Sequence, residues 1–413
     1  MTTGTSQAKI PGGRLRVALI GYGFMGAAHS HAWRSIRPFF DGSLAPELVV
    51  LCGRTPDRVA AAADRYGFAE WATDWHEVVS RDDVDVVDVV TPGDSHCEIA
   101  VGALEAGKHV LCEKPLANTV AEAEAMVDAA AVAHAHGVRS MVGFNYRRVP
   151  ALTLAHNLIA DGELGRIFHV RAVYLQDWII DPDFPLVWRL DRERAGSGSL
   201  GDLGAHIVDL AQWLTGEQIT GLSALTETFV KERPRPSAYA GLGAEASGTE
   251  RFPVTVDDAA LFLARLSGGG VATFEATRFA AGRKNGLRIE INGERGTLTF
   301  DMESLNELEL YKRPATPTER DQETAGFRRI LVTEPIHPYV SAWWPAGHIL
   351  GWEHSHTHQV RDFVAAIEAG QDPVPSFEDG LRVQRVLDAV VQSAESGAGW
   401  VTLASEREPS LTR

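Results

Sequence analysis

Residues 16–26 read RVALIGYGFMG, and this stretch decides the fold. The first five residues predict a buried strand, and Gly21, Gly23 and Gly26 then form G-x-G-x-x-G where a helix should start, near Met25. In this pattern the first glycine permits a tight turn, the second lets a pyrophosphate approach the backbone, and the third lets helix and strand pack closely. We therefore expect a dinucleotide-binding turn with the pyrophosphate on the free amides of the helix start.

Short apolar runs alternate with helical stretches as far as residue 146. Further strands are expected at 48–52, 85–90, 109–112 and 140–144, with helices at 57–66, 95–106 and 120–136. This alternation predicts an α/β fold with a doubly wound parallel sheet, a Rossmann domain over residues 14–146. Residues 1–13 have no apolar core and should form a flexible arm.

The pattern changes after Asn145, and residues 147–413 are expected to form a second domain of the α+β class. A helix at 151–160 is followed by strand patterns at 167–175, 259–266, 270–278, 287–292 and 297–301. Turns containing glycine join several of these strands, so the sheet should be mostly antiparallel and packed on helices. Residues 231–250 are expected to form a long surface loop.

The end of the second strand bears on the choice of dinucleotide. An NAD site usually places a carboxylate there for the ribose 2′-hydroxyl, but this chain has Cys52-Gly53-Arg54-Thr55. Arg54 could bind a 2′-phosphate with paired donors and Thr55 could add a hydroxyl, which favours NADP over NAD. Arg54 could instead be solvated or stack on adenine, which leaves NAD open.

Three side chains are candidates for chemistry. Lys114 lies in Glu113-Lys114-Pro115 at the end of the fourth strand, where ligands of open α/β sheets bind, and could stabilise negative charge on a substrate oxygen. Asp202 and His206 follow a glycine-rich loop and would share one helix face. A histidine can move a proton near neutral pH, and a carboxylate could orient it. The structural alternatives are a surface lysine, a helix-capping aspartate and a core histidine.

Together these fragments resemble the Gfo/Idh/MocA family of glucose–fructose oxidoreductase and inositol dehydrogenase. The resemblance rests on GYGFMG at 21–26, Thr91-Pro92 with His96 following, EKP at 113–115, and GDLGAH at 201–206 with Asp209. It implies a nicotinamide-dependent enzyme with Lys114, Asp202 and His206 as catalytic residues. It also implies a large open sheet in the second domain, which often forms the interface of dimers or tetramers, and a peptide bond before Pro115 that is often cis.

One position departs from the family pattern, because Gly93 stands where an asparagine is common, and this puts a nearby cofactor contact in doubt. The cofactor contacts that remain expected are Gly21, Gly23, Phe24, Met25, Gly26, Arg54, Thr55, Thr91, Pro92, His96, Glu113 and Lys114.

Within the family, the second half resembles levoglucosan dehydrogenase-like members, which implies oxidation of a hydroxyl on an anhydro-sugar. This resemblance rests on YLQDW at 174–178, Pro185-Leu186 with Trp188-Arg189, AGSG at 195–198, Gly282-Arg283 with Asn285, and HPY at 337–339. The residues expected to contact substrate are Lys114, Asn145, Arg147, Gln176, Trp178, Trp188, Arg189, Asp202 and His206.

The expected reaction is hydride transfer between a secondary hydroxyl of a sugar, anhydro-sugar or cyclic polyol and the nicotinamide. His206 would take the hydroxyl proton, Lys114 would stabilise the oxyanion, and Asp202 would hold His206. Two other enzymatic readings stay open: a glycoside-cleaving enzyme that works by oxidation and elimination, and an NADPH-dependent carbonyl reductase. A non-catalytic dinucleotide sensor is disfavoured, since all three candidate residues are present.

Composition limits the partners. The 413-residue chain has a net charge of −16 and no basic stripe, so nucleic acid is not an expected partner. It has no apolar run of the roughly 20 residues that cross a bilayer, so no membrane association is expected either. The cysteines lack metal-ligand spacing, and His354 and His358 could share a helix face without an evident third ligand, so no metal is expected. We expect a cytoplasmic homodimer or homotetramer.

Overall fold

The computed structural model describes residues 13–237 and 243–403, and within them the first half is built on a sheet of six parallel strands. The strands are β1 (Arg14–Ile20), β2 (Ala45–Cys52), β3 (Glu70–Ala72), β4 (Val86–Val89), β5 (His109–Cys112) and β6 (Ser140–Val142). Their order, β3-β2-β1-β4-β5-β6, changes direction at β1, which confirms the doubly wound sheet. Ligands of such sheets bind beyond the carboxyl ends of the strands on either side of that point.

Helices cover both faces of this sheet. They are α1 (Phe24–Phe39), α2 (Pro56–Tyr66), α3 (Trp75–Val79), α4 (His96–Glu105) and α5 (Val120–His134). Local signals set their ends: α2 stops at Gly67, which has a left-handed φ of 79°, and α5 begins with a capping box between Thr119 and Glu122. The short β3 and α3 were not expected, because Glu70–Ala72 is mostly exposed and carries no apolar run.

The second half contains a larger mixed sheet, with nine strands among the described residues. They are β7 (Ile167–Leu175), β8 (Ile219–Glu227), β11 (Ala259–Leu266), β12 (Val271–Thr277), β13 (Gly286–Gly293), β14 (Gly296–Asp301), β15 (Glu307–Lys312), β16 (Arg328–Leu331) and β17 (Val401–Thr402). The order is β16-β15-β14-β13-β7-β12-β11-β8-β17, and β7 with β12 is parallel while the other pairs are antiparallel. This confirms the mostly antiparallel sheet.

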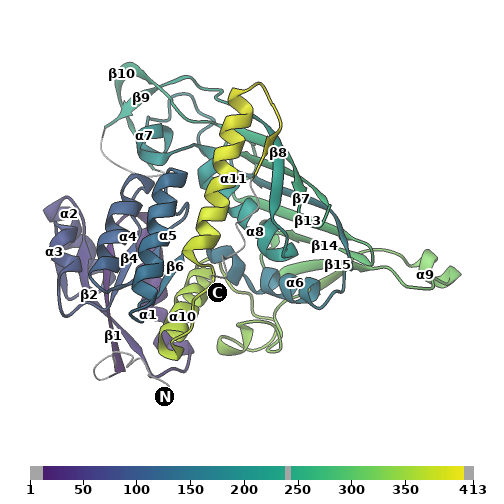
Figure 1. Ribbon diagram of the computed structural model, residues 1–413, viewed down its shortest axis with the longest axis horizontal. Coiled ribbons are helices and arrows are strands. Elements are labelled where there is room, and N and C mark those ends of the chain that lie inside the picture. The colour runs from purple at the N-terminus through teal and green to yellow at the C-terminus, as the bar shows by residue number, and fades with distance from the viewer. Residues whose placement is uncertain (1–12, 238–242, 404–413) are drawn as a thin grey trace, which may run out of the picture.

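Helices α6 (Pro150–Ala160), α8 (Ala205–Thr215) and α11 (Phe377–Glu395) pack on the second sheet. In Figure 1 the Rossmann half lies on the left, the large sheet on the right, and α11 stands between them. Two short helices, α7 (Arg192–Ala195) and α9 (Glu319–Glu323), lie in its connections, and α9 sits at the tip of a projecting arm.

The expectation of a long surface loop over 231–250 is wrong for ten of those twenty residues, and residues 238–242 of the range lie outside the described residues. β9 (Glu232–Pro236) and β10 (Ala246–Pro253) pair as an antiparallel hairpin, with a register shift between Ser247 and Arg251. The sequence did not predict this hairpin, because β9 is rich in proline, β10 is mostly exposed, and neither strand alternates apolar with polar residues. Residues 1–12 of the expected N-terminal arm lie outside the described residues.

The chain returns to the Rossmann half near its end. Helix α10 (Glu353–Ala369) packs against α1, and its Val360 and Phe363 join Val17 and Trp33 in one buried cluster. Beyond α10, Arg139 donates to the carbonyls of Gly370 and Gln371. Residues 147–413 therefore do not all belong to the second domain, because α10 packs into the core of the Rossmann domain (Figure 1).

Among the described residues, every helix is too short or too polar to cross a lipid bilayer.

Candidate active site

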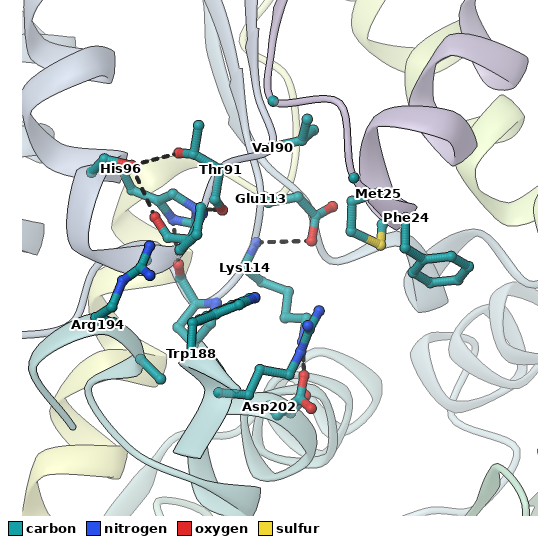
Figure 2. Close-up of a pocket in the computed structure, with 18 of the residues that line it drawn as sticks. Phe24, Met25, Val90, Thr91, His96, Glu113, Lys114, Trp188, Arg194 and Asp202 are labelled. Carbon is teal, nitrogen blue, oxygen red and sulfur yellow. Dashed lines mark hydrogen bonds and ion pairs between the residues drawn. The ribbon is translucent and has the colours of Figure 1, made fainter. Parts of the chain in front are cut away.

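A cavity of about 1220 Å³ runs from the glycine turn of the Rossmann half to the second sheet. It brings together eighteen of the residues singled out from the sequence, and Figure 2 shows part of its wall. Two expected contacts, Gly26 and Arg147, do not line it. The residues gathered are Gly21, Gly23, Phe24, Met25, Arg54, Thr55, Thr91, Pro92, His96, Glu113, Lys114, Asn145, Gln176, Trp178, Trp188, Arg189, Asp202 and His206.

The glycine turn fits a dinucleotide. A Cβ on Gly21 would lie 2.8 Å from the Val90 oxygen, and one on Gly26 would lie 2.6 Å from the Gly21 oxygen, so both positions exclude side chains for packing reasons. A Cβ on Gly23 would meet nothing within 4 Å. Gly23 also caps α1 without a side-chain hydrogen bond, so the first amides of α1 are left for an anion.

The cavity end beside β2 carries cations in place of a carboxylate. Gly53 leaves room for the Tyr22 ring, which would lie 2.1 Å from a Cβ at that position, so a larger residue fits there only if Tyr22 moves. Arg54, Thr55 and Arg58 line the same end.

The departure at Gly93 has a steric cause. A Cβ on Gly93 would lie 2.4 Å from Oδ1 of Asn118, so the side chain of Asn118 occupies the space that an asparagine at 93 would need. Asn118 lines the cavity and donates to the Arg194 carbonyl at 3.2 Å. The side-chain amide of Asn118 therefore lies in the cavity wall close to the place where an asparagine at position 93 would put its own amide.

Lys114 reaches from the end of β5 to the second half. Its Nζ donates to the main-chain oxygen of Asp202 at 2.7 Å and lies 3.2 Å from Oδ1 of that residue; Figure 2 shows the two side by side. His96 braces the turn, with Nδ1 3.0 Å from the Pro115 oxygen and Nε2 2.9 Å from the Thr91 oxygen. The Lys114–Pro115 bond is cis, as the family resemblance implied.

Asp202 lies between two cations. Oδ2 of Asp202 accepts from Nη2 of Arg278 at 2.9 Å, while Oδ1 faces Lys114. Burial alone would raise the pKa of Asp202, but Lys114 and Arg278 outweigh it and hold the pKa far below its usual range. Within the described part of the chain no hydrogen bond joins Asp202 to His206, so the expectation that Asp202 holds this ring is not met.

The loop before Asp202 is held by the carboxylate of Asp257, which lies in the connection just before β11. Asp257 accepts from the amides of Gly198 and Leu200 and from the hydroxyl of Ser199, at 2.6–2.8 Å. Leu200–Gly204 then forms a π-helical turn that leads into α8. Such turns often occur at functional sites, and this one separates Asp202 from the regular helix that carries His206.

His206 is a buried, neutral ring that faces the cavity. It stacks on Tyr146 with centroids 4.2 Å apart, and Tyr146 hydrogen-bonds Tyr174 at 2.8 Å. Burial and the charge of Lys114 lower the pKa of His206 well below its usual range. A neutral imidazole beside an ammonium group is suited to accept a proton.

Behind Lys114 lies a buried charge network. Nδ1 of His29 on α1 is 2.9 Å from Asp88 and Nε2 is 3.0 Å from Glu113, while Trp33 donates to Asp88 at 2.7 Å. Burial alone would lower the pKa of His29, but the two carboxylates outweigh it and raise the pKa to about 10. Glu113 is in turn the residue before Lys114, so this network ties α1 to the lysine turn.

Hydrogen-bonded polar groups and tryptophans form the wall opposite the cofactor turn. Asn285 accepts from Tyr174 at 2.7 Å and from Gln176 at 2.8 Å, and Gln176 accepts from Trp178 at 2.9 Å. The guanidinium of Arg189 lies over the Trp188 ring at 4.4 Å. Fixed amides beside aromatic faces suit a hydroxylated ring with apolar C–H faces.

Arg147 points away from this wall. Its guanidinium forms a buried ion pair with Asp209, 2.5 Å between Nη2 and Oδ1, and lines a separate hollow of about 260 Å³. Placing Arg147 among the substrate contacts was therefore wrong. Arg147 is only two residues from Asn145, but Asn145 lines the large cavity and Arg147 lines the separate hollow.

The three histidines in the sequence HSHTH, residues 354–358, each contact a different partner. His354 accepts from the Gly351 amide, His356 pairs with Asn145, and His358 accepts from Trp343. Ligand atoms of His29, Glu113 and His356 lie within 4.8 Å of one another. The two nitrogens of His29 both face carboxylates, which engages both of its possible metal-ligating atoms.

Comparison with known proteins agrees with this geometry. Residues 15–144 match the model for an oxidoreductase family with an NAD-binding Rossmann fold, and residues 152–299 match the GFO/IDH/MocA C-terminal domain. The chain belongs to the Gfo/Idh/MocA oxidoreductase family.

One relative and two solved structures show how closely the chain follows members of this family. Levoglucosan dehydrogenase of Pseudarthrobacter phenanthrenivorans is 41% identical over 94% of this chain and 97% of its own length. The crystal structure of an oxidoreductase domain protein from Kribbella flavida is 61% identical with a TM-score of 0.89, covering 95% of this chain and all of that one. A levoglucosan dehydrogenase complex with NADH and levoglucosan is 39% identical with a TM-score of 0.86 over the same shares.

Several cavity residues were not foreseen as contacts. Arg278 had no signal, since one arginine after a strand forms no pattern with Asp202, 76 positions away. Tyr174 and Asn285 stood in the fragments that resembled levoglucosan dehydrogenase-like members, and that could have placed them in the wall. The other unforeseen lining residues include Tyr22, Asn118 and Tyr146.

Proposed function

We propose that this chain oxidises a secondary hydroxyl of a sugar or cyclic polyol, with an anhydro-sugar such as levoglucosan as the first candidate substrate. The observation that carries the proposal is that Lys114 from the Rossmann half and His206 from the second half line one cavity with the glycine turn. The similarity to levoglucosan dehydrogenase over nearly the whole chain supports the choice of substrate.

The residues divide the work as follows. Neutral His206 takes the proton of the substrate hydroxyl, and Lys114 donates a hydrogen bond to the same oxygen as negative charge develops on it. A bound nicotinamide would supply the hydride acceptor, so the alcohol carbon loses a hydride and becomes a carbonyl carbon. Asp202 keeps the ammonium of Lys114 in place rather than orienting His206.

The test is a panel of levoglucosan, myo-inositol, glucose and 1,5-anhydroglucitol with each nicotinamide cofactor, reading the absorbance of the reduced form. We expect turnover with levoglucosan and a loss of at least a hundredfold in kcat for Lys114→Met, with cofactor affinity kept. Lys108→Met is the matched control, because Lys108 precedes the same strand at its other end and, among the described residues, donates to the carbonyls of Arg81 and Val84. Near-normal turnover of Lys114→Met would refute the proposal, and substrate cleavage without net cofactor reduction would favour oxidation and elimination.

The same cavity supports use of NADP as well as NAD. Arg54 and Arg58 line the end beside β2, and Gly53 offers no carboxylate to repel a 2′-phosphate. We expect Arg54→Ala to raise KM for NADP several-fold more than KM for NAD. Gly53→Asp should restore NAD selectivity only together with Tyr22→Ala, because the Tyr22 ring fills the space of the new side chain.

The open face of the second sheet supports assembly into a dimer or tetramer. Leu225, Leu261, Leu263 and Val271 are exposed on the neighbouring strands β8, β11 and β12, and Leu225 pairs with Leu261. Such a patch is typical of an interface. Leu261→Glu with Leu263→Glu should lower the mass measured by light scattering, whereas Val132→Glu, an equally exposed apolar site on α5, should not.

A further inference from the structure

We propose that Arg278 is a positioning residue that fixes the Asp202 carboxylate and, through it, the direction of the Lys114 ammonium. The inference rests on the function proposed above. No motif marks Arg278, and its place in the chemistry follows from its contacts alone.

Arg278 is itself firmly anchored. It follows β12, is 1% exposed, and donates from Nη2 to the Gly198 carbonyl at 3.0 Å and from Nη1 to the Arg189 carbonyl at 3.4 Å. Its guanidinium lies 5.4 Å from the centroid of the Trp178 ring. The group is therefore held by the loop before Asp202 and by the segment that carries the substrate wall.

This anchor determines how Asp202 can sit. Oδ2 lies 2.9 Å from Arg278 and Oδ1 lies 3.2 Å from Lys114, and the charge of Arg189 also acts on this carboxylate. A carboxylate bonded on both sides cannot rotate without losing one charged hydrogen bond. Without Arg278, Oδ2 would lose the charged hydrogen bond described above, and the carboxylate could turn away from Lys114 or toward His206.

The direction of Lys114 follows from the same contacts. An ammonium group has three donors. In this structure two of them are directed to Asp202, one to the main-chain oxygen at 2.7 Å and one toward Oδ1. These two hydrogen bonds fix the direction of the third N–H bond of Lys114, which is the one available for a substrate oxygen.

The test is a double-mutant cycle on kcat with Arg278→Met, Asp202→Asn and the pair together. We expect each single change to lower kcat by about 10- to 100-fold, and the pair to be no slower than the slower single variant, because both remove one linked interaction. Arg139→Met is the control: Arg139 is also buried and bonds main-chain carbonyls, but it lies outside the cavity, and its kcat should stay within about twofold.

Two further measurements separate positioning from a loss of folding. Arg278→Lys keeps the positive charge and should recover part of kcat, and added guanidinium ion should partly restore Arg278→Ala, while cofactor affinity stays unchanged throughout. Losses that multiply in the pair, normal kcat in Arg278→Met, or no recovery by either route would overturn the inference. If Lys114→Met is inactive while Arg278→Met is normal, only this inference fails; if Lys114→Met is active, the proposed function fails.

Discussion

The imidazole of His29 should keep its proton well into the alkaline range. Asp88 and Glu113 raise the pKa of His29 to about 10 from an ordinary value of 6.5, although burial opposes this. At pH 8.5 the folded ring should hold its proton almost fully, while the ring in the unfolded chain should be about 1% protonated. Unfolding in this range therefore releases one proton.

The sign of the effect on stability follows. Because the folded pKa is raised, the contribution of His29 is fully present below pH 6.5 and is lost as the pH rises toward 10. The slope is about 1.4 kcal/mol per pH unit, so about 2 kcal/mol should disappear between pH 7 and pH 8.5. Other titrating groups change stability in the same range, so the quantity to measure is the difference from His29→Gln, in which the effects of groups that do not interact with His29 cancel.

Two assays check this expectation. In protein with ¹⁵N-labelled histidine, the ring signals absent from His29→Gln should keep imidazolium shifts up to pH 8.5. In urea unfolding, the advantage of the wild type over His29→Gln should shrink by about 2 kcal/mol across the same interval. A ring that loses its proton between pH 6 and 7, or a difference that stays constant with pH, would refute the reasoning.

Three further outcomes are expected. His206→Asn should lower kcat by about 100-fold or more while keeping cofactor affinity, and the wild type should keep most of its turnover down to about pH 6, because the pKa of His206 is lowered; steady-state pH profiles check both. Asp257→Ala should cost about 2 kcal/mol of stability in thermal unfolding and lower kcat, since it frees two amides and a hydroxyl in the loop before Asp202. Gly23→Ala should weaken cofactor binding without lowering the melting temperature, whereas Gly26→Ala should lower both, as fluorescence titration and thermal shift would show.

Local patterns predicted five of the six strands of the Rossmann sheet and five of the nine described strands of the second sheet, but not β8, β15, β16, β17 or α11. The strand at 167–175 was expected with the bounds it has, and those at 259–266 and 109–112 also match, because buried strands of β-branched and apolar residues leave a clear signal. β3 and the hairpin of β9 and β10 are mostly exposed, so their sequences carry no apolar pattern that would predict a strand. The surrounding structure, rather than local sequence, determines where these strands form.

The candidate site was predictable only where a motif or a resemblance carried it. Lys114, Asp202 and His206 lie in motifs, and the structure gathers them in one cavity. The partner of Asp202 was assigned incorrectly, because a spacing of four suggests a pair on a regular helix, whereas a π-helical turn intervenes and a distant arginine supplies the bond. Contacts between residues so far apart in the chain depend on tertiary packing.

Because α10 closes the apolar face formed by Leu15, Val17 and Leu111, the nucleotide half is not a continuous stretch of the polypeptide. A fragment that stops at residue 150 would expose that face to water, so neither half can be separated by one cut and kept as a working module. During synthesis, the packing of the first strands is completed only after Phe363, which lies far downstream in the sequence, has been made.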